Sequence, residues 1–100
     1  MQGDRTGNMK CQVVRSCSSW SIGATETNTE FSIQIAYIEL IAKSKSFIYI
    51  ENQFFMSSTG HKAIKNNICY ALVERITLAF ERGEPFKVYI FLPLLPSFAG

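Results

Sequence analysis

Two patterns of apolar residues alternate along this 100-residue chain. One is helical spacing, and the other is the continuous run typical of a buried strand. Between residues 61 and 82, an apolar side chain recurs at every fourth position, namely at Ile64, Ile68, Leu72, Ile76 and Phe80. This pattern predicts an amphipathic helix over residues 61–82. Gly83 follows directly and suits the left-handed position that comes after many helix ends.

Residues 30–46 also show helical spacing, with apolar residues at Phe31, Ile35, Ile38 and Ala42. Thr27 and Glu30 stand three positions apart and fit a capping box, in which both side chains bind free backbone amides at a helix start. The pattern therefore predicts a helix that begins at Glu30.

Three short runs predict strands, at residues 12–15 (QVVR), 47–50 (FIYI) and 86–92 (FKVYIFL). The last two show little alternation, which predicts strands buried on both faces, as in parallel sheets. The order strand, helix, strand, helix, strand predicts an α/β fold built as a βαβαβ unit of a mostly parallel sheet. Ligands of such sheets bind beyond the carboxyl ends of the strands. Those ends lie at residues 16–20, at residues 51–55 and from residue 93 onward.

The composition narrows the class of protein. The chain is 47% hydrophobic and 18% charged with a net charge of +2, which excludes a disordered chain and gives no nucleic-acid signature. The three cysteines are odd in number and their spacings fit no zinc pattern, and we predict them to be reduced in an intracellular protein. We predict no metal and no cofactor. No apolar run is long enough to span a membrane. His61 is the only histidine and Asp4 the only aspartate.

Polar side chains end the otherwise apolar strand at residues 47–50, where Glu51, Asn52 and Gln53 follow one another. An unpaired polar group costs about 1–3 kcal/mol when it is buried. These side chains therefore lie either in solvent at the rim of the sheet or hydrogen-bonded in a site, and their positions alone leave both interpretations open.

Four short motifs resemble, in order and spacing, segments of eukaryotic phospholipase D. They are residues 12–16 (QVVRS) with Trp20 and Ser21, residues 32–37 (SIQIAY), residues 49–55 (YIENQFF) and residues 88–100 (VYIFLPLLPSFAG). The resemblance implies that residues 11–100 are part of a phospholipase D catalytic domain, an α/β sandwich, and precede the second of two HxKxxxxD motifs.

Residues 1–10 are polar and are expected to form a loop or a disordered end.

The family's catalytic residues are not expected in this chain. In the family, one histidine attacks phosphorus, the other protonates the leaving alcohol, and lysines stabilise the phosphoryl charge. After His61, Ala63 and Ile68 stand where the motif requires Lys and Asp. We therefore expect no catalytic residue in these 100 residues and no activity of the chain alone.

The resemblance places Asn52, Gln53 and Phe54 in the substrate pocket, where they would position substrate without transferring protons. Glu51 as a general base is the alternative role for this segment. Arg15 is a candidate phosphate or phosphoinositide contact, or else a charge facing solvent. A second basic residue found nearby in some family members is replaced in this sequence by Ser19. Trp20 is a candidate membrane-interface residue, or else part of the core.

The resemblance also implies a reaction. It is hydrolysis of the distal phosphodiester of phosphatidylcholine-type lipids to phosphatidic acid and a free headgroup, with transphosphatidylation to alcohols. The expected partners are the phospholipid substrate, the membrane surface and the rest of the chain that carries the HKD motifs, but no nucleic acid. The expected location is cytoplasmic and peripheral to membranes. The alternative is a non-catalytic lipid-binding or protein-interaction module derived from a phospholipase D.

Overall fold

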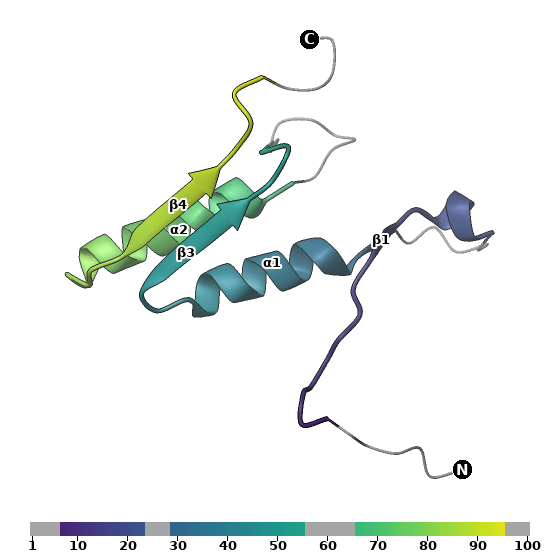
Figure 1. The fold of residues 1–100 in the computed structure, drawn as a ribbon, viewed down its shortest axis with the longest axis horizontal. Helices are drawn as coiled ribbons and strands as arrows, with labels where there is room; N and C mark the ends of the chain where they lie inside the picture. The colour runs from purple at the N-terminus through teal and green to yellow at the C-terminus, as the bar shows by residue number, and fades with distance from the viewer. Residues whose placement is uncertain (1–6, 24–28, 56–65, 96–100) are drawn as a thin grey trace.

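The computed structural model describes residues 7–23, 29–55 and 66–95 (Figure 1). Its elements follow one another as β1 (Ser16–Cys17), the 3-10 helix η1 (Ser19–Ile22), β2 (Glu30–Phe31), α1 (Ser32–Lys43), β3 (Phe47–Glu51), α2 (Ile68–Glu81) and β4 (Lys87–Phe91). Helices and strands alternate from α1 onward, and the chain is therefore of the predicted α/β class.

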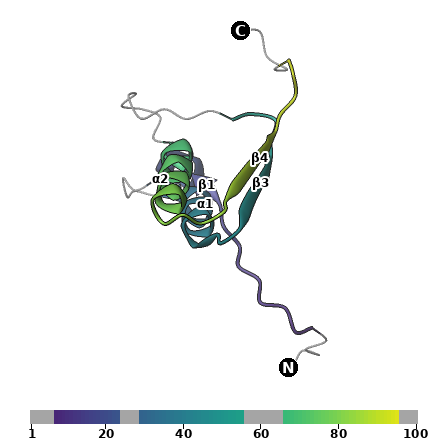
Figure 2. The same cartoon turned by 90° about the vertical axis from the view of Figure 1, so that its left-hand side faces the viewer.

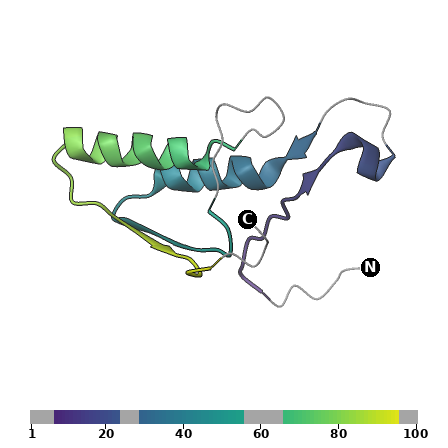
Figure 3. The ribbon, with the colours of Figure 1, turned by 90° about the horizontal axis from the view of Figure 1, so that it is seen from above.

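The two longer strands form a parallel pair. β3 and β4 are aligned from Phe47 beside Lys87 to Glu51 beside Phe91. The apolar runs at residues 47–50 and 86–92 thus form strands, as predicted. Helices α1 and α2 lie together on one side of this pair, so the chain has one helical layer and one sheet layer (Figures 2 and 3).

A small core lies between the two layers. Its buried side chains come from α1, β3 and α2, namely Ile41, Ile50, Ala71 and Leu72. Partly buried residues pack around them, including Ile48 and Val88 on the inner face of the sheet. Of the helix stripe that the sequence predicted, Leu72 is buried and Ile68 packs against the core, but Ile76 is 45% and Phe80 85% exposed. The predicted stripe is therefore wrong for the second half of α2, where Arg75 and Ala79 are the buried residues.

The prediction that both strands are buried on both faces is wrong for this chain. Successive side chains of β3 point to opposite faces, and Phe47, Tyr49 and Glu51 are exposed. On β4, Tyr89 and Phe91 are exposed as well. The reason is that the helical layer formed within this chain covers only one face of the sheet.

The first predicted strand is also corrected. Residues 12–15 belong to no strand, and β1 begins only at Ser16. β1 pairs with β2 in an antiparallel ladder of two residue pairs, apart from β3 and β4. Within the described residues, the parallel sheet has two strands instead of three.

Helix α1 begins two residues later than predicted. Glu30 lies in β2 and pairs with Cys17, so the helix starts at Ser32. The Ser32 hydroxyl accepts a hydrogen bond from the Arg15 amide (2.8 Å) and donates one to the Arg15 carbonyl (2.9 Å). This contact across 17 positions fixes the start of the helix. Thr27, the other half of the predicted capping box, lies outside the described residues.

Helix α2 spans Ile68–Glu81, so it starts later than the helix predicted over residues 61–82, and the described residues Asn66 and Asn67 precede it. Residues 61–65, which include His61, lie outside the described residues. The prediction for Gly83 is confirmed, because its φ is +65° and its amide donates to the Phe80 carbonyl at 3.1 Å. The Glu84 amide reaches the Ala79 carbonyl at 2.9 Å, which closes the helix end.

Candidate functional site

The parallel pairing brings the carboxyl ends of β3 and β4 side by side. The Asn52 amide donates a 3.2 Å hydrogen bond to the Phe91 carbonyl and extends the ladder by one step. A cavity of about 400 Å³ opens at this edge, lined by Glu51, Asn52, Gln53, Phe91, Leu92 and Pro93. Two of the three expected strand ends, at residues 51–55 and from 93 onward, therefore meet.

A second, smaller cavity lies on the helix side of the same strand end. It measures about 130 Å³, and its lining comes from β3, α1 and the start of α2, namely Tyr37, Ile50, Asn52, Phe54, Phe55, Asn66, Ile68 and Cys69. Asn52 lines both cavities. Its amide group offers one acceptor and two donors, and Phe54 adds an aromatic wall.

Six residues of the smaller cavity are not predicted for a site by the sequence, and Tyr37, Cys69 and Asn66 are the polar or sulfur-bearing ones among them. Helical spacing assigns Tyr37 and Cys69 to packing, and no motif includes Asn66. The Asn66 carboxamide oxygen accepts a hydrogen bond from the Ile68 amide at 3.1 Å, next to the start of α2. The sequence gives no signal for Asn66, because the predicted helix over residues 61–82 includes it, and only the structure shows that α2 starts after it.

The carboxylate of Glu51 has a partner on its own strand. The Tyr49 hydroxyl donates to it at 3.1 Å, and the Tyr49 ring lies 6.4 Å from the Phe91 ring, centroid to centroid. The hydrogen bond to Glu51 raises the pKa of Tyr49, with a smaller contribution from desolvation. Glu51 therefore lies on the outer face of the sheet, at the wall of the larger cavity.

Arg15 and Trp20 lie on a different part of the molecule. Arg15 Nε donates to Glu30 Oε2 at 2.7 Å, and this hydrogen bond, together with the charge of Glu30, raises the pKa of Arg15. Trp20 lies in η1 with 84% of its surface exposed, so the core alternative for it does not hold in this chain. Figures 1 and 3 show β1 and η1 beyond the start of α1, away from the β3–β4 edge. The third expected strand end therefore does not join the other two.

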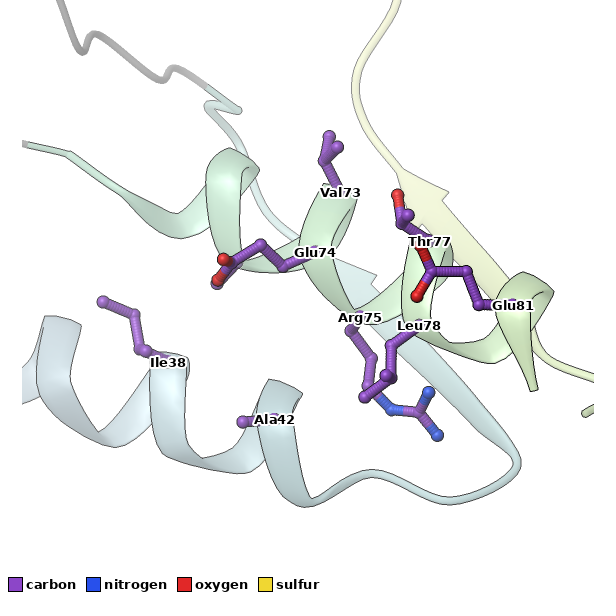
Figure 4. A pocket seen from close by; sticks show the side chains of 9 residues that line it. Ile38, Ala42, Val73, Glu74, Arg75, Thr77, Leu78 and Glu81 are labelled. Carbon is purple, nitrogen blue, oxygen red and sulfur yellow. The ribbon is translucent and has the colours of Figure 1, made fainter.

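A cavity between the two helices has different chemistry. It measures about 480 Å³ and lies between α1 and α2 (Figure 4), where Ile38 and Ala42 face α2. Ala71 and Leu78 continue its apolar lining, and Glu74 and Glu81 carry charge beside it. None of the residues that the sequence predicted for a site lines it. We therefore place the candidate site at the strand ends, where converging amide side chains offer specific hydrogen bonds.

Two further properties bear on this site. Across residues 7–23, 29–55 and 66–95, no three side chains of the His, Cys, Asp or Glu type come together as metal ligands. No helix in these same ranges is long and apolar enough to cross a membrane. The polar side chains that line the two strand-end cavities are amides, the Tyr37 hydroxyl and the Glu51 carboxylate, and they lie among aromatic, aliphatic and Cys69 side chains.

Comparisons with known proteins agree on one family. A family model described as phospholipase D matches residues 3–99. The chain is 53% identical over 90 residues to phospholipase D of Phytophthora infestans, covering 89% of this chain and 5% of that protein. It is 48% identical over 97 residues to phospholipase D1 of Schizosaccharomyces pombe (95% of this chain, 7% of that protein). It is 46% identical over 99 residues to phospholipase D zeta 1 of Arabidopsis thaliana (98% and 9%).

The matched region is nearly the whole of this chain but a small part of each relative, between 5% and 9% of their lengths in these three cases. It includes residues 49–55 and the strand-end cavity, so the site described above lies within the shared sequence. From the family model and from the identity over most of its length, the chain belongs to the phospholipase D family.

Proposed function

We propose that this chain is a segment of a phospholipase D that hydrolyses the distal phosphodiester of phosphatidylcholine-type lipids. The products are phosphatidic acid and the free headgroup, or a phosphatidyl alcohol when an alcohol replaces water. In this proposal the segment precedes the second HxKxxxxD motif within an α/β sandwich. The parent protein acts as a cytoplasmic enzyme peripheral to the membrane.

The observation that supports this role most directly is the position of Asn52. It lines both cavities at the carboxyl ends of β3 and β4, beside Gln53 in one and Phe54 in the other. Amide groups at this edge can donate hydrogen bonds to phosphoryl or glycerol oxygens and can orient the phosphodiester. Neither amide side chain titrates near neutral pH, so their part is positioning and not proton transfer.

The covalent chemistry belongs to histidines and lysines elsewhere in the parent protein. The 100-residue sequence has one histidine, His61, and Ala63 and Ile68 occupy the Lys and Asp positions of the motif. A double displacement at phosphorus needs a nucleophile and a separate general acid. The chain alone is therefore proposed to be inactive.

The test uses the full-length parent protein and the 100-residue chain in parallel. Each is incubated with phosphatidylcholine vesicles, with and without a primary alcohol, and choline and phosphatidyl alcohol are measured. The parent should release choline and form the phosphatidyl alcohol, and the chain should do neither. A parent without turnover would contradict the proposed activity and favour the lipid-binding alternative. Turnover by the chain alone would contradict its proposed inactivity.

A further inference from the structure

The segment that follows β4 is strongly apolar and stands in solvent. Leu94 is 97% exposed and Leu95 80% exposed, and Leu92 and Pro93 precede them. In Figures 1 and 2 the chain leaves the end of β4 in a direction away from α1 and α2. We refer to residues 92–95 as the apolar segment. Exposed leucines side by side mark a surface that an apolar partner covers.

The charge distribution separates the apolar segment from two other exposed apolar surfaces, the outer face of the sheet and the groove between the helices. Residues 92–100 contain no Asp, Glu, Lys, Arg or His. The outer face of the sheet, by contrast, carries Glu51 and Lys87, and the groove between the helices carries Glu74 and Glu81. Charges make insertion into hydrocarbon costly, so those two surfaces suit protein partners and the apolar segment suits lipid.

The backbone of this segment also favours an apolar environment. Pro93 and Pro96 have no amide hydrogen, so two backbone donors are missing from five consecutive residues, 92–96. Fewer donors lose hydrogen bonds to water when such a segment enters the acyl region of a bilayer.

The apolar segment adjoins the candidate site. Leu92 and Pro93 line the 400 Å³ cavity together with Phe91 and with three residues at the end of β3, namely Glu51, Asn52 and Gln53. A phospholipid has a polar phosphodiester joined to two acyl chains, so a site for it needs polar groups next to an apolar path. The two strand ends supply this order, with amides from β3 on one side and Leu92 and Pro93 on the other, while Leu94 and Leu95 lie outside the cavity.

We propose that Leu94 and Leu95 insert into the acyl region of the phospholipid bilayer and hold the strand-end site at the membrane surface. This proposal rests on the proposed function, since it takes the site to be one for a phospholipid. The apolar segment then serves to bring the site to substrate in a membrane and has no part in the chemical step.

The test compares three forms of the full-length parent protein, namely the wild type, L94D/L95D and the matched control L94W/L95W, which keeps the segment apolar. Binding is measured by flotation with phosphatidylcholine vesicles. Turnover is measured on the same vesicles and on a short-chain phosphatidylcholine kept monomeric in solution. We expect L94D/L95D to lose about tenfold or more in vesicle binding and in vesicle turnover. Its kcat/KM on the monomeric substrate should stay within about twofold of the wild type, and L94W/L95W should bind vesicles like the wild type.

Two results would overturn the inference. One is unchanged vesicle binding by L94D/L95D. The other is an equal loss on both substrates with a lowered Tm, which would show that the parent protein buries these leucines in its interior. Absence of turnover in the wild type would count against the proposed function only, because flotation still decides whether the leucines bind the membrane.

Discussion

Arg75 Nε donates a 2.9 Å hydrogen bond to the backbone carbonyl of Ser44, which ties α2 to the loop between α1 and β3. The guanidinium carbon lies 4.2 Å from the centroid of the Phe86 ring, just before β4. A terminal nitrogen of the same group stands 3.7 Å from Glu84. Arg75 is only 7% exposed, so this one side chain holds together the segments that enter both strands.

Substitution of Arg75 tests how much of this role is packing. Arg75→Ala should lower the free energy of unfolding by about 2 kcal/mol or more, because it uncovers Phe86 and leaves the Ser44 carbonyl without its donor. Arg75→Met should cost less, because a long apolar side chain can replace a buried charge with little loss. Urea unfolding of the chain, followed by circular dichroism, measures both. Equal losses in the two variants would show that the charge, and not the packing, is the main contribution.

The turn after α2 depends on Gly83. Gly83 adopts the left-handed conformation, with φ +65°. This conformation costs a residue with a Cβ atom about 1–2 kcal/mol of conformational energy. Gly83→Ala should therefore lower the free energy of unfolding by about 1 kcal/mol, although no heavy atom would contact the new methyl group. Gly7→Ala is the matched control, since it too meets open space and Gly7 has no positive φ. Similar stabilities of the two variants would contradict this reasoning.

The ionisation of Tyr49 reports on its contact with Glu51. A hydroxyl that donates to a carboxylate loses this bond when it ionises, which raises the pKa of Tyr49 above its ordinary value near 10. A raised pKa in the folded state contributes stability at all pH values below about 10, and this contribution is lost as the pH rises through the folded-state pKa. Absorbance titration should show the Tyr49 transition, identified with Tyr49→Phe, move to lower pH in Glu51→Ala. An unmoved transition would exclude the contact in solution.

The exposed outer face of the sheet should make the isolated chain associate. Phe47, Tyr49 and Phe91 share this face, and the buried core among the described residues is small. We expect dye binding to apolar surface and concentration-dependent oligomers in sedimentation velocity. Phe47→Lys combined with Phe91→Lys should reduce both signals. A monomeric chain with a sharp, reversible thermal transition would argue against this expectation.

The features that the sequence predicts correctly have local causes. The strands at residues 47–50 and 86–92 follow from continuous β-branched and aromatic runs, and the end of α2 follows from Gly83. Parallel pairing follows from the helix between the two strands. Because parallel strands end at the same edge of a sheet, the residues after β3 are then expected to lie beside Pro93, which follows β4.

The features that the sequence does not predict depend on contacts between distant parts of the chain. Ser32 binds the backbone of Arg15 and sets the start of α1, which no local pattern around Glu30 indicates. Tyr37 and Cys69 reach the smaller cavity from two different helices, so their spacing within each helix gives no signal of it. The outer face of the sheet is exposed because both α-helices of the described chain lie on the other face. The residues of a strand do not show how many helices will cover it.

Asn52 offers the most direct test of the candidate site. Loss of one hydrogen bond to a charged group costs about 1.5–3 kcal/mol, so Asn52→Ala in the parent protein should lower kcat/KM on phosphatidylcholine by about tenfold or more. Asn52→Asp should be worse, because its carboxylate would repel the phosphodiester. Asn67→Ala is the matched control, since Asn67 is exposed and lines neither strand-end cavity. Steady-state choline release measures all three variants, and wild-type kcat/KM in Asn52→Ala would remove this residue from the substrate pocket.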